Sequence, residues 1–228
     1  MEFLNNVLGQ VKSFCQTLRE TSPKYHNSIP DPNLQDIGGG QLEILLLDVS
    51  GSMADTDYKP TRLDGAKRAS TGFISRIMES NQESFVAIIN FSSTASVVCM
   101  PISVKSNIAS LKQLIHSLTI SGGTNIPAGL KLSEKVIRKC KNAVNPRILL
   151  LTDGENLEDG SPVPVAERLK SQGIQIDIIG IGGSPSDVNE KDLKEMASVV
   201  NGELRYWFIK SAGELVKKFE DLAIREIK

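Results

Sequence analysis

Two aspartates stand at the ends of the two most apolar stretches of the chain. Asp48 lies near the end of the run 42–49, and Asp153 directly follows the run 147–152. A carboxylate at the end of a buried strand is costly unless an opposite charge or hydrogen bonds compensate it. One cation shared by the two aspartates would compensate both. The sequence therefore predicts a cation site where these two strands end.

Hydroxyl side chains accompany both aspartates. Ser50 and Ser52 follow Asp48 at alternate positions, and the glycine between them lets the backbone fold around one point. Thr124 stands further along, behind two glycines that permit a close approach to the site. Hydroxyl and carboxylate oxygens are hard ligands that suit Mg²⁺, Mn²⁺ or Ca²⁺. Because only Asp48 and Asp153 carry charge, the metal would stay electrophilic and accept an acidic group from a partner.

Strands and helices alternate along the part of the chain that must position these side chains. The hydrophobic pattern predicts strands over 42–49, 85–91, 95–101, 147–152, 174–181 and 204–209, and helices over 63–78, 108–118, 126–140, 163–172, 191–200 and after Ser211. This alternation predicts an α/β fold, a doubly wound and mostly parallel six-stranded sheet with helices on both faces and one antiparallel edge strand at 95–101. In such sheets ligands bind beyond the carboxyl ends of the strands, where the strand order reverses.

The first 40 residues differ from the rest. Apolar residues at helical spacing predict an amphipathic helix over 3–18, and three prolines followed by Gly38-Gly39-Gly40 predict a linker. We expect two parts, the N-terminal helix with its linker over 1–40 and the α/β domain over 41–228. The apolar stripe of the helix would pack on the domain, on a second copy or on a partner, and the sequence leaves these open.

The composition excludes several classes of protein. The 228 residues are 40% hydrophobic and 23% charged, as in ordinary globular proteins, and the net charge of -1 creates no field toward nucleic acid or an anionic membrane. No apolar run approaches the ~20 residues of a membrane helix, and the N-terminus lacks the pattern of a secretory signal. Three cysteines without C-x-x-C spacing indicate neither a disulfide framework nor a zinc site. We expect a cytoplasmic protein that binds neither nucleic acid nor membrane.

Together the metal-site segments resemble the metal-ion-dependent adhesion site of von Willebrand factor A domains. That pattern is D-x-S-x-S after the first strand, a separate Thr, and an Asp after the fourth strand. Asp48, Ser50, Ser52, Thr124 and Asp153 fill all five positions, and the resemblance covers roughly residues 42–225. It implies a Rossmann-like fold in which Ser50, Ser52 and Thr124 contact the metal directly. The two aspartates would act mainly through bound waters and leave one coordination position for the partner.

Three functions remain in competition. The first is a non-enzymatic, metal-dependent module that binds a partner's Asp or Glu, since neither a general base nor a nucleophile is evident. The second is a metal-dependent phosphoester hydrolase, which is disfavoured because haloacid-dehalogenase-type phosphatases carry D-x-D where this chain has Ser50. The third is a scaffold with a structural metal that binds partners through its N-terminal helix. Resemblance to small bacterial proteins of this family implies an accessory factor of an AAA-type ATPase or of a protein kinase or phosphatase.

Acidic and bulky residues occupy the loops around the predicted site. The polar segment 52–60 is a candidate specificity loop, in which Met53 and Tyr58 would contact a partner. The remaining loop carboxylates are Asp55, Asp57, Glu155, Glu158 and Asp159. They are interpreted as solvated loop charge, and the alternative is that they surround the site with negative charge and tune its affinity for the metal or the partner.

Overall fold

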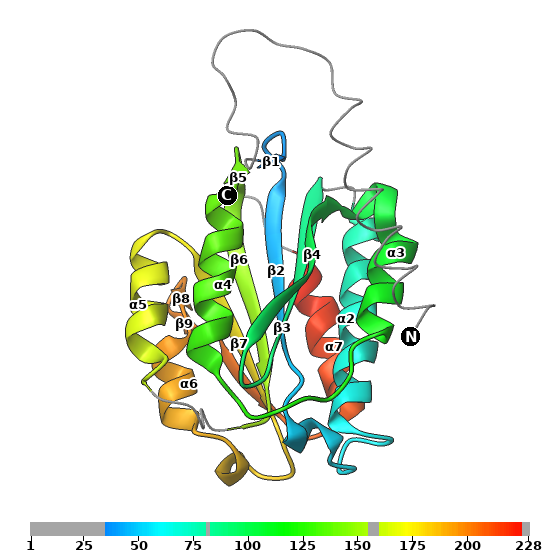
Figure 1. Ribbon diagram of the computed structural model, residues 1–228, viewed down its shortest axis with the longest axis vertical. Coiled ribbons are helices and arrows are strands. Elements are labelled where there is room, and N and C mark those ends of the chain that lie inside the picture. Colours follow the sequence, from blue (N-terminus) through cyan, green and yellow to red (C-terminus); the bar gives the residue numbers. More distant parts are fainter. Residues whose placement is uncertain (1–34, 81–82, 155–159, 225–228) are drawn as a thin grey trace, which may run out of the picture. The chain divides into compact units, whose positions relative to one another are not determined.

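The computed structural model describes residues 35–80, 83–154 and 160–224 (Figure 1). The predicted helix over 3–18 and most of the predicted linker lie outside these residues. In the described part of the chain, no helix is both long enough and apolar enough to cross a membrane.

A six-stranded sheet forms the centre of the domain. Its strands are β2 (Gln41–Asp48), β3 (Ser84–Phe91), β4 (Ala95–Ser103), β6 (Val144–Thr152), β7 (Gln175–Ile181) and β10 (Tyr206–Ile209). They lie in the order β10-β7-β6-β2-β3-β4, and every neighbouring pair is parallel except β3 and β4. This confirms the predicted fold class, including the antiparallel strand at one edge.

Helices cover both faces of the sheet (Figure 1). They are α2 (Arg62–Glu79), α3 (Val104–His116), α4 (Ile126–Arg138), α5 (Val163–Ser171), α6 (Glu190–Met196) and α7 (Ala212–Ala223). Helices α2, α3 and α7 lie on one face, and α4, α5 and α6 lie on the other. Strand β2 has β3 on one side and β6 on the other, so the strand order reverses between β2 and β6.

Shorter elements complete the described chain. They are two 3-10 helices, η1 (Gly51–Ala54) and η2 (Pro185–Asp187), and two pairs of two-residue strands, β1 (Gln35–Asp36) with β5 (Cys140–Lys141) and β8 (Val199–Val200) with β9 (Glu203–Leu204). The helix predicted over 191–200 was too long, because α6 ends at Met196 and the chain turns into β8. The backbone of Ala197 is extended, and two adjacent β-branched valines favour a strand over a helix.

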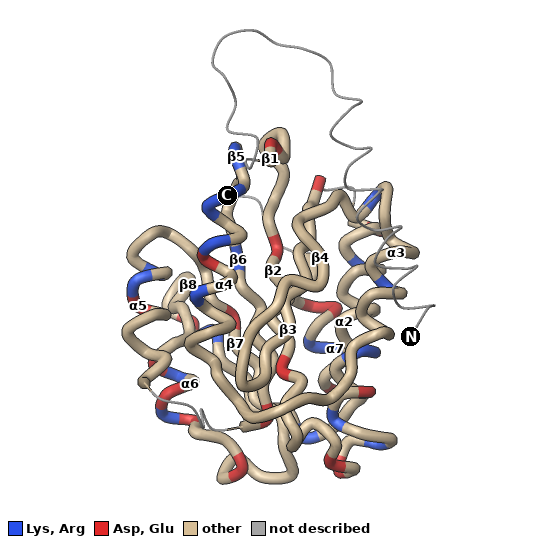
Figure 2. Tube along the Cα trace, in the orientation of Figure 1, with Lys and Arg blue, Asp and Glu red and all other residues tan. Residues whose placement is uncertain are grey.

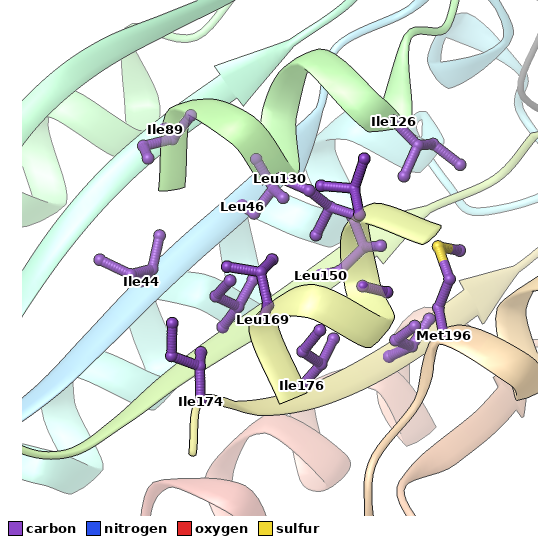
Figure 3. Close-up of a cluster of buried hydrophobic side chains, with 14 of the residues drawn as sticks. Ile44, Leu46, Ile89, Ile126, Leu130, Leu150, Leu169, Ile174, Ile176 and Met196 are labelled. Atoms are coloured by element: carbon purple, nitrogen blue, oxygen red, sulfur yellow. The ribbon is translucent and has the colours of Figure 1, made fainter. Parts of the chain in front are cut away.

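Strand β2 is buried on both faces along all eight residues, which explains its continuous apolar sequence. Ile44 and Leu46 pack with Leu130 of α4 and Leu169 of α5 in a cluster of buried side chains (Figure 3). Helix α4 approaches the strand closely at Gly129, where a Cβ atom would lie 3.0 Å from a methyl carbon of Leu46. Strand β2 is therefore packed closely against α4 on this face of the sheet.

A buried ion network joins the sheet to α7. Arg147 of β6, which is 1% exposed, contacts Glu43 of β2 (Nε to Oε2, 2.7 Å) and Asp177 of β7 (Nη1 to Oδ2, 3.1 Å). It also donates a hydrogen bond of 2.8 Å to the carbonyl of Leu222 in α7. Burial raises the pKa of Asp177, but hydrogen bonds and charge from Arg205 and Arg147 outweigh it, so the pKa lies below its ordinary value.

We expect Arg147→Met to lower the free energy of unfolding by about 3–5 kcal/mol, because it removes the buried counter-charge of Glu43 and leaves Asp177 with Arg205. Urea denaturation measures this loss. The control is Arg76→Met in the exposed ion pair with Glu79, for which a change of about 0–1 kcal/mol is expected. Equal losses in the two variants would contradict a structural role for the network.

Candidate metal site

Three segments that are far apart in the sequence meet at the carboxyl ends of β2 and β6. The hydroxyl of Ser52 donates a hydrogen bond of 2.8 Å to Oδ1 of Asp153, across 101 residues of sequence, and lies 3.2 Å from the hydroxyl of Ser50. A Cβ atom on Gly154 would lie 3.6 Å from Oγ1 of Thr124 and 3.9 Å from Oγ of Ser52. The three hydroxyls and Asp153 therefore surround one small region beside Gly154.

Asp48 lies beneath these groups at the end of β2 and is fully buried. Its Oδ1 accepts a hydrogen bond from the backbone N–H of Ser50 (2.8 Å), and its Oδ2 accepts one from the hydroxyl of Thr152 (2.7 Å). These bonds fix the carboxylate plane and turn the chain after β2 toward β6. The structure thus brings together all five residues that the sequence singles out.

A glycine turn brings Thr124 to the site. Gly122 has φ of +57°, and a Cβ atom there would lie 2.9 Å from the hydroxyl of Ser93, so a larger residue would be strained and crowded. The carbonyl of Gly122 accepts a hydrogen bond of 3.0 Å from the N–H of Gly51, which links this turn to the segment after β2. Asn125 then caps α4 by accepting a hydrogen bond from the N–H of Ala128 (2.9 Å), which fixes the residue beside Thr124.

Burial makes the charged forms of both aspartates unfavourable. For Asp48, burial and then the charge of Asp153 raise the pKa to about 7, against the opposing hydrogen bonds from Ser50 and Thr152. Burial also raises the pKa of Asp153, although Arg62 and Ser52 stabilise its charged form. A cation held between these carboxylates would offset the energetic cost of their burial.

Arg62, the first residue of α2, is a site residue that the sequence analysis missed. Its Nη1 lies 3.0 Å from Oδ2 of Asp153, and its Nε and Nη2 each lie 2.8 Å from an oxygen of Asp57. A cation is disfavoured in the first turn of a helix, where the helix dipole is positive. An arginine at the start of this helix, directly after a loop rich in aspartate, was the sequence signal that could have revealed Arg62 as a site residue.

Two side chains of the segment 52–60, Met53 in η1 and Tyr58 in the loop before α2, do not face the surface as the sequence suggested. Met53 and Tyr58 are both buried, and the hydroxyl of Tyr58 donates a hydrogen bond to the carbonyl of Ile209 in β10. The interpretation of these two side chains as partner contacts was therefore wrong. Both aspartates of this loop pair with Arg62, Asp57 at 2.8 Å and Asp55 at 3.5 Å. Glu155, Glu158 and Asp159 lie outside the described residues.

The donor set suits a hard divalent cation. It offers three hydroxyls and two carboxylates, which are the ligand types that Mg²⁺, Mn²⁺ and Ca²⁺ accept. Over the described ranges, no cluster of three or more His, Cys, Asp or Glu side chains that could hold a metal ion is present. The residues gathered here therefore fit a site with few charged ligands rather than a thiolate or histidine site.

A doubly wound α/β sheet with hydroxyl and carboxylate side chains gathered at its switch point defines the class of this domain. The family model of the von Willebrand factor type A domain matches residues 44–155, which span β2, α2, α4 and β6. The fold is also that of the von Willebrand factor type A protein from Catenulispora acidiphila, with a TM-score of 0.67 at 23% identity over 81% of this chain and 42% of that chain. The chain belongs to the von Willebrand factor A domain family.

Curated relatives carry the same domain within longer proteins. The calcium-activated chloride channel regulator 1 of Macaca mulatta is 31% identical over 180 residues, which are 78% of this chain and 18% of that protein. The 26S proteasome non-ATPase regulatory subunit 4 of Caenorhabditis elegans is 24% identical over 163 residues, which are 70% of this chain and 46% of that protein. The chain thus spans less than half the length of these relatives, and the part shared with them is a domain type that acts as a protein-interaction module.

We expect Asp48→Asn to stabilise the metal-free protein at pH 8, by up to about 4 kcal/mol. The folded pKa of about 7 lies above the ordinary value of 3.8, so ionisation of Asp48 costs stability progressively between those values and fully above pH 7. The advantage of the variant should therefore shrink as the pH falls toward 4. Melting temperatures measured in EDTA from pH 4.5 to pH 8 test this, and parallel curves for the two proteins would contradict it.

Proposed function

We propose that this chain is a metal-dependent protein-binding module. Asp48, Ser50, Ser52, Thr124 and Asp153 would hold Mg²⁺, Mn²⁺ or Ca²⁺, and an acidic residue of a partner protein would complete the coordination. The observation that carries the proposal is the convergence of Ser50, Ser52 and Thr124 on the buried Asp153, with Ser52 only 2.8 Å from its carboxylate.

The charge of the ligand set supports a carboxylate as the incoming group. Two aspartates carry the same formal charge as a divalent cation, with the opposite sign. Part of their negative charge is already compensated by hydrogen bonds from the protein, so the cation keeps a net attraction for a further anion. Ser50, Ser52 and Thr124 add no charge. An acidic side chain is therefore attracted to the site, whereas a set of four carboxylates would repel it.

The surface beside the site is open to a partner. Gly51, Ser52, Ser121 and Gly122 are exposed, and none of them carries a large side chain. Among the described residues, no bulky side chain of these four positions stands between Ser52 and an aspartate or glutamate from another protein. This arrangement supports binding in trans.

Hydrolysis is less well supported than binding. Both oxygens of Asp48 accept hydrogen bonds within the protein, and the side chain has no exposed surface. A nucleophilic carboxylate needs a free oxygen aimed at the substrate. We therefore propose a non-enzymatic role, and turnover of a generic phosphoester that is lost in Asp48→Asn would overturn it.

The class of partner is proposed from the resemblance to the family. The relative from Caenorhabditis elegans is a non-ATPase regulatory subunit of the 26S proteasome. Together with the resemblance to small bacterial proteins, this supports an accessory factor in the cytoplasm that binds an AAA-type ATPase or a protein kinase or phosphatase. Neither nucleic acid nor a membrane surface is proposed as a ligand.

We expect Thr124→Val to abolish the rise in melting temperature that saturating Mg²⁺ gives the unaltered protein. Valine has the shape of threonine but lacks the hydroxyl, so the variant keeps the fold and loses one ligand. Thermal denaturation in Mg²⁺ and in EDTA measures the difference. The matched control is Thr119→Val in the exposed part of the same connection, which should keep the full Mg²⁺ response. An unchanged response in Thr124→Val would remove Thr124 from the site.

Partner capture should depend on both the metal and the site. A tagged protein incubated with lysate of its source organism in Mg²⁺ should retain a partner that is absent in EDTA and absent with Thr124→Val. The same partner in all three samples would contradict metal-bridged binding. Loss of that partner on Leu8→Asp instead would transfer the binding to the N-terminal segment and support the scaffold hypothesis.

A further inference from the structure

Arg62 is surrounded by carboxylates at the edge of the candidate metal site. Its side chain is 8% exposed. Asp153 and Asp57 accept its hydrogen bonds, and Asp55 and Asp187 lie at 3.5 Å and 4.0 Å from its terminal nitrogens. Figure 2 shows acidic and basic positions close together at this end of the domain. A guanidinium stays charged at all ordinary pH values, so a permanent positive charge lies beside the site.

The two oxygens of Asp153 have different roles. Oδ1 faces the hydroxyl of Ser52, on the side where the metal ligands converge, and Oδ2 faces Arg62. Arg62 therefore leaves the ligand side of the carboxylate free. It nevertheless places a positive charge within a few ångströms of the region that a divalent cation would occupy.

The positive charge near Asp153 has opposite effects on the metal-free and the metal-bound protein. In the metal-free protein, two buried aspartates repel each other, and Arg62 neutralises one of them. In the metal-bound protein, the same guanidinium repels the cation. Because Arg62 and a metal ion stabilise the same carboxylate, each reduces the benefit of the other.

We propose that Arg62 is the internal counter-charge of Asp153, which stabilises the metal-free domain and weakens its affinity for divalent cations. The inference rests on the proposed metal site and goes beyond it, because it assigns a residue outside the ligand set that sets the affinity. Arg62 is a positioning residue, and it acts on the metal only through Asp153 and through its charge.

A substitution of Asp57 tests the inference through an expected change in metal affinity that is opposite to the change expected for Arg62→Gln. Asp57 shares the charge of Arg62 through two contacts of 2.8 Å, and it belongs to the loop rather than to the ligand set. Asp57→Asn removes that partner and leaves more of the positive charge facing Asp153. The variant should therefore bind divalent cations more weakly, whereas Arg62→Gln should bind them more tightly.

The experiment compares the full chain with Arg62→Gln, Asp57→Asn and the control Arg76→Gln, which lies on the same helix away from the site. Calorimetry gives the dissociation constant of Mg²⁺, and thermal denaturation gives the melting temperature in EDTA and in saturating Mg²⁺. Arg62→Gln should melt several degrees lower in EDTA, bind Mg²⁺ on the order of tenfold more tightly, and recover most of the loss in Mg²⁺. Asp57→Asn should bind several-fold more weakly, and Arg76→Gln should match the unaltered protein.

Three results would overturn the inference. Equal or weaker Mg²⁺ affinity in Arg62→Gln would mean that the arginine only clamps the loop at Asp57. Should Arg62→Gln fail to fold, unchanged or tighter binding by Asp57→Asn would decide against the inference. Absence of any Mg²⁺ response in the unaltered protein would instead refute the proposed metal site, and the inference with it.

Discussion

The structure of this domain depends on two buried carboxylates at the ends of adjacent central strands. Asp48 and Asp153 end β2 and β6, and burial raises the pKa of both. Charged groups of like sign are not tolerated there without compensation. Four groups each supply part of this compensation, and they are the hydroxyls of Ser52 and Thr152, the backbone N–H of Ser50 and the guanidinium of Arg62. The surrounding turns are shaped to deliver these groups.

The same two strands carry a second ionic cluster of a different kind. In their amino-terminal halves, Glu43 and Arg147 form a closed network with Asp177 and the end of α7, fully removed from solvent. At the carboxyl ends the compensation is partial, and the hydroxyl of Ser52 reaches the surface. A closed cluster stabilises the fold, whereas an open one with unfavourable buried charge is suited to binding. The doubly wound topology places the open cluster at the switch point, where the loops diverge and leave room for a ligand.

Arg62 connects the carboxyl ends of β2 and β6 to the loop that precedes α2. One guanidinium holds Asp153 of the site and Asp57 of the loop, and the ring of Tyr58 packs beneath Gly65 of the same helix. The loop is therefore part of the support of the site. In the part of the chain that the structure describes, small residues such as Gly51, Ser52 and Gly122 form the exposed border of the site.

The sequence by itself determined the fold class and singled out the five side chains that the structure brings together at the carboxyl ends of β2 and β6. Both follow from short-range patterns: buried strands have continuous apolar runs, and side chains just after parallel strands must gather at one edge of the sheet. Only the tertiary structure decided the role of Arg62, because its partner Asp153 is 91 residues away and four carboxylates compete for it. It also decided the burial of Met53 and Tyr58 and the end of α6 at Met196. In both cases, packing against distant strands overrides the local polarity and periodicity on which the sequence predictions were based.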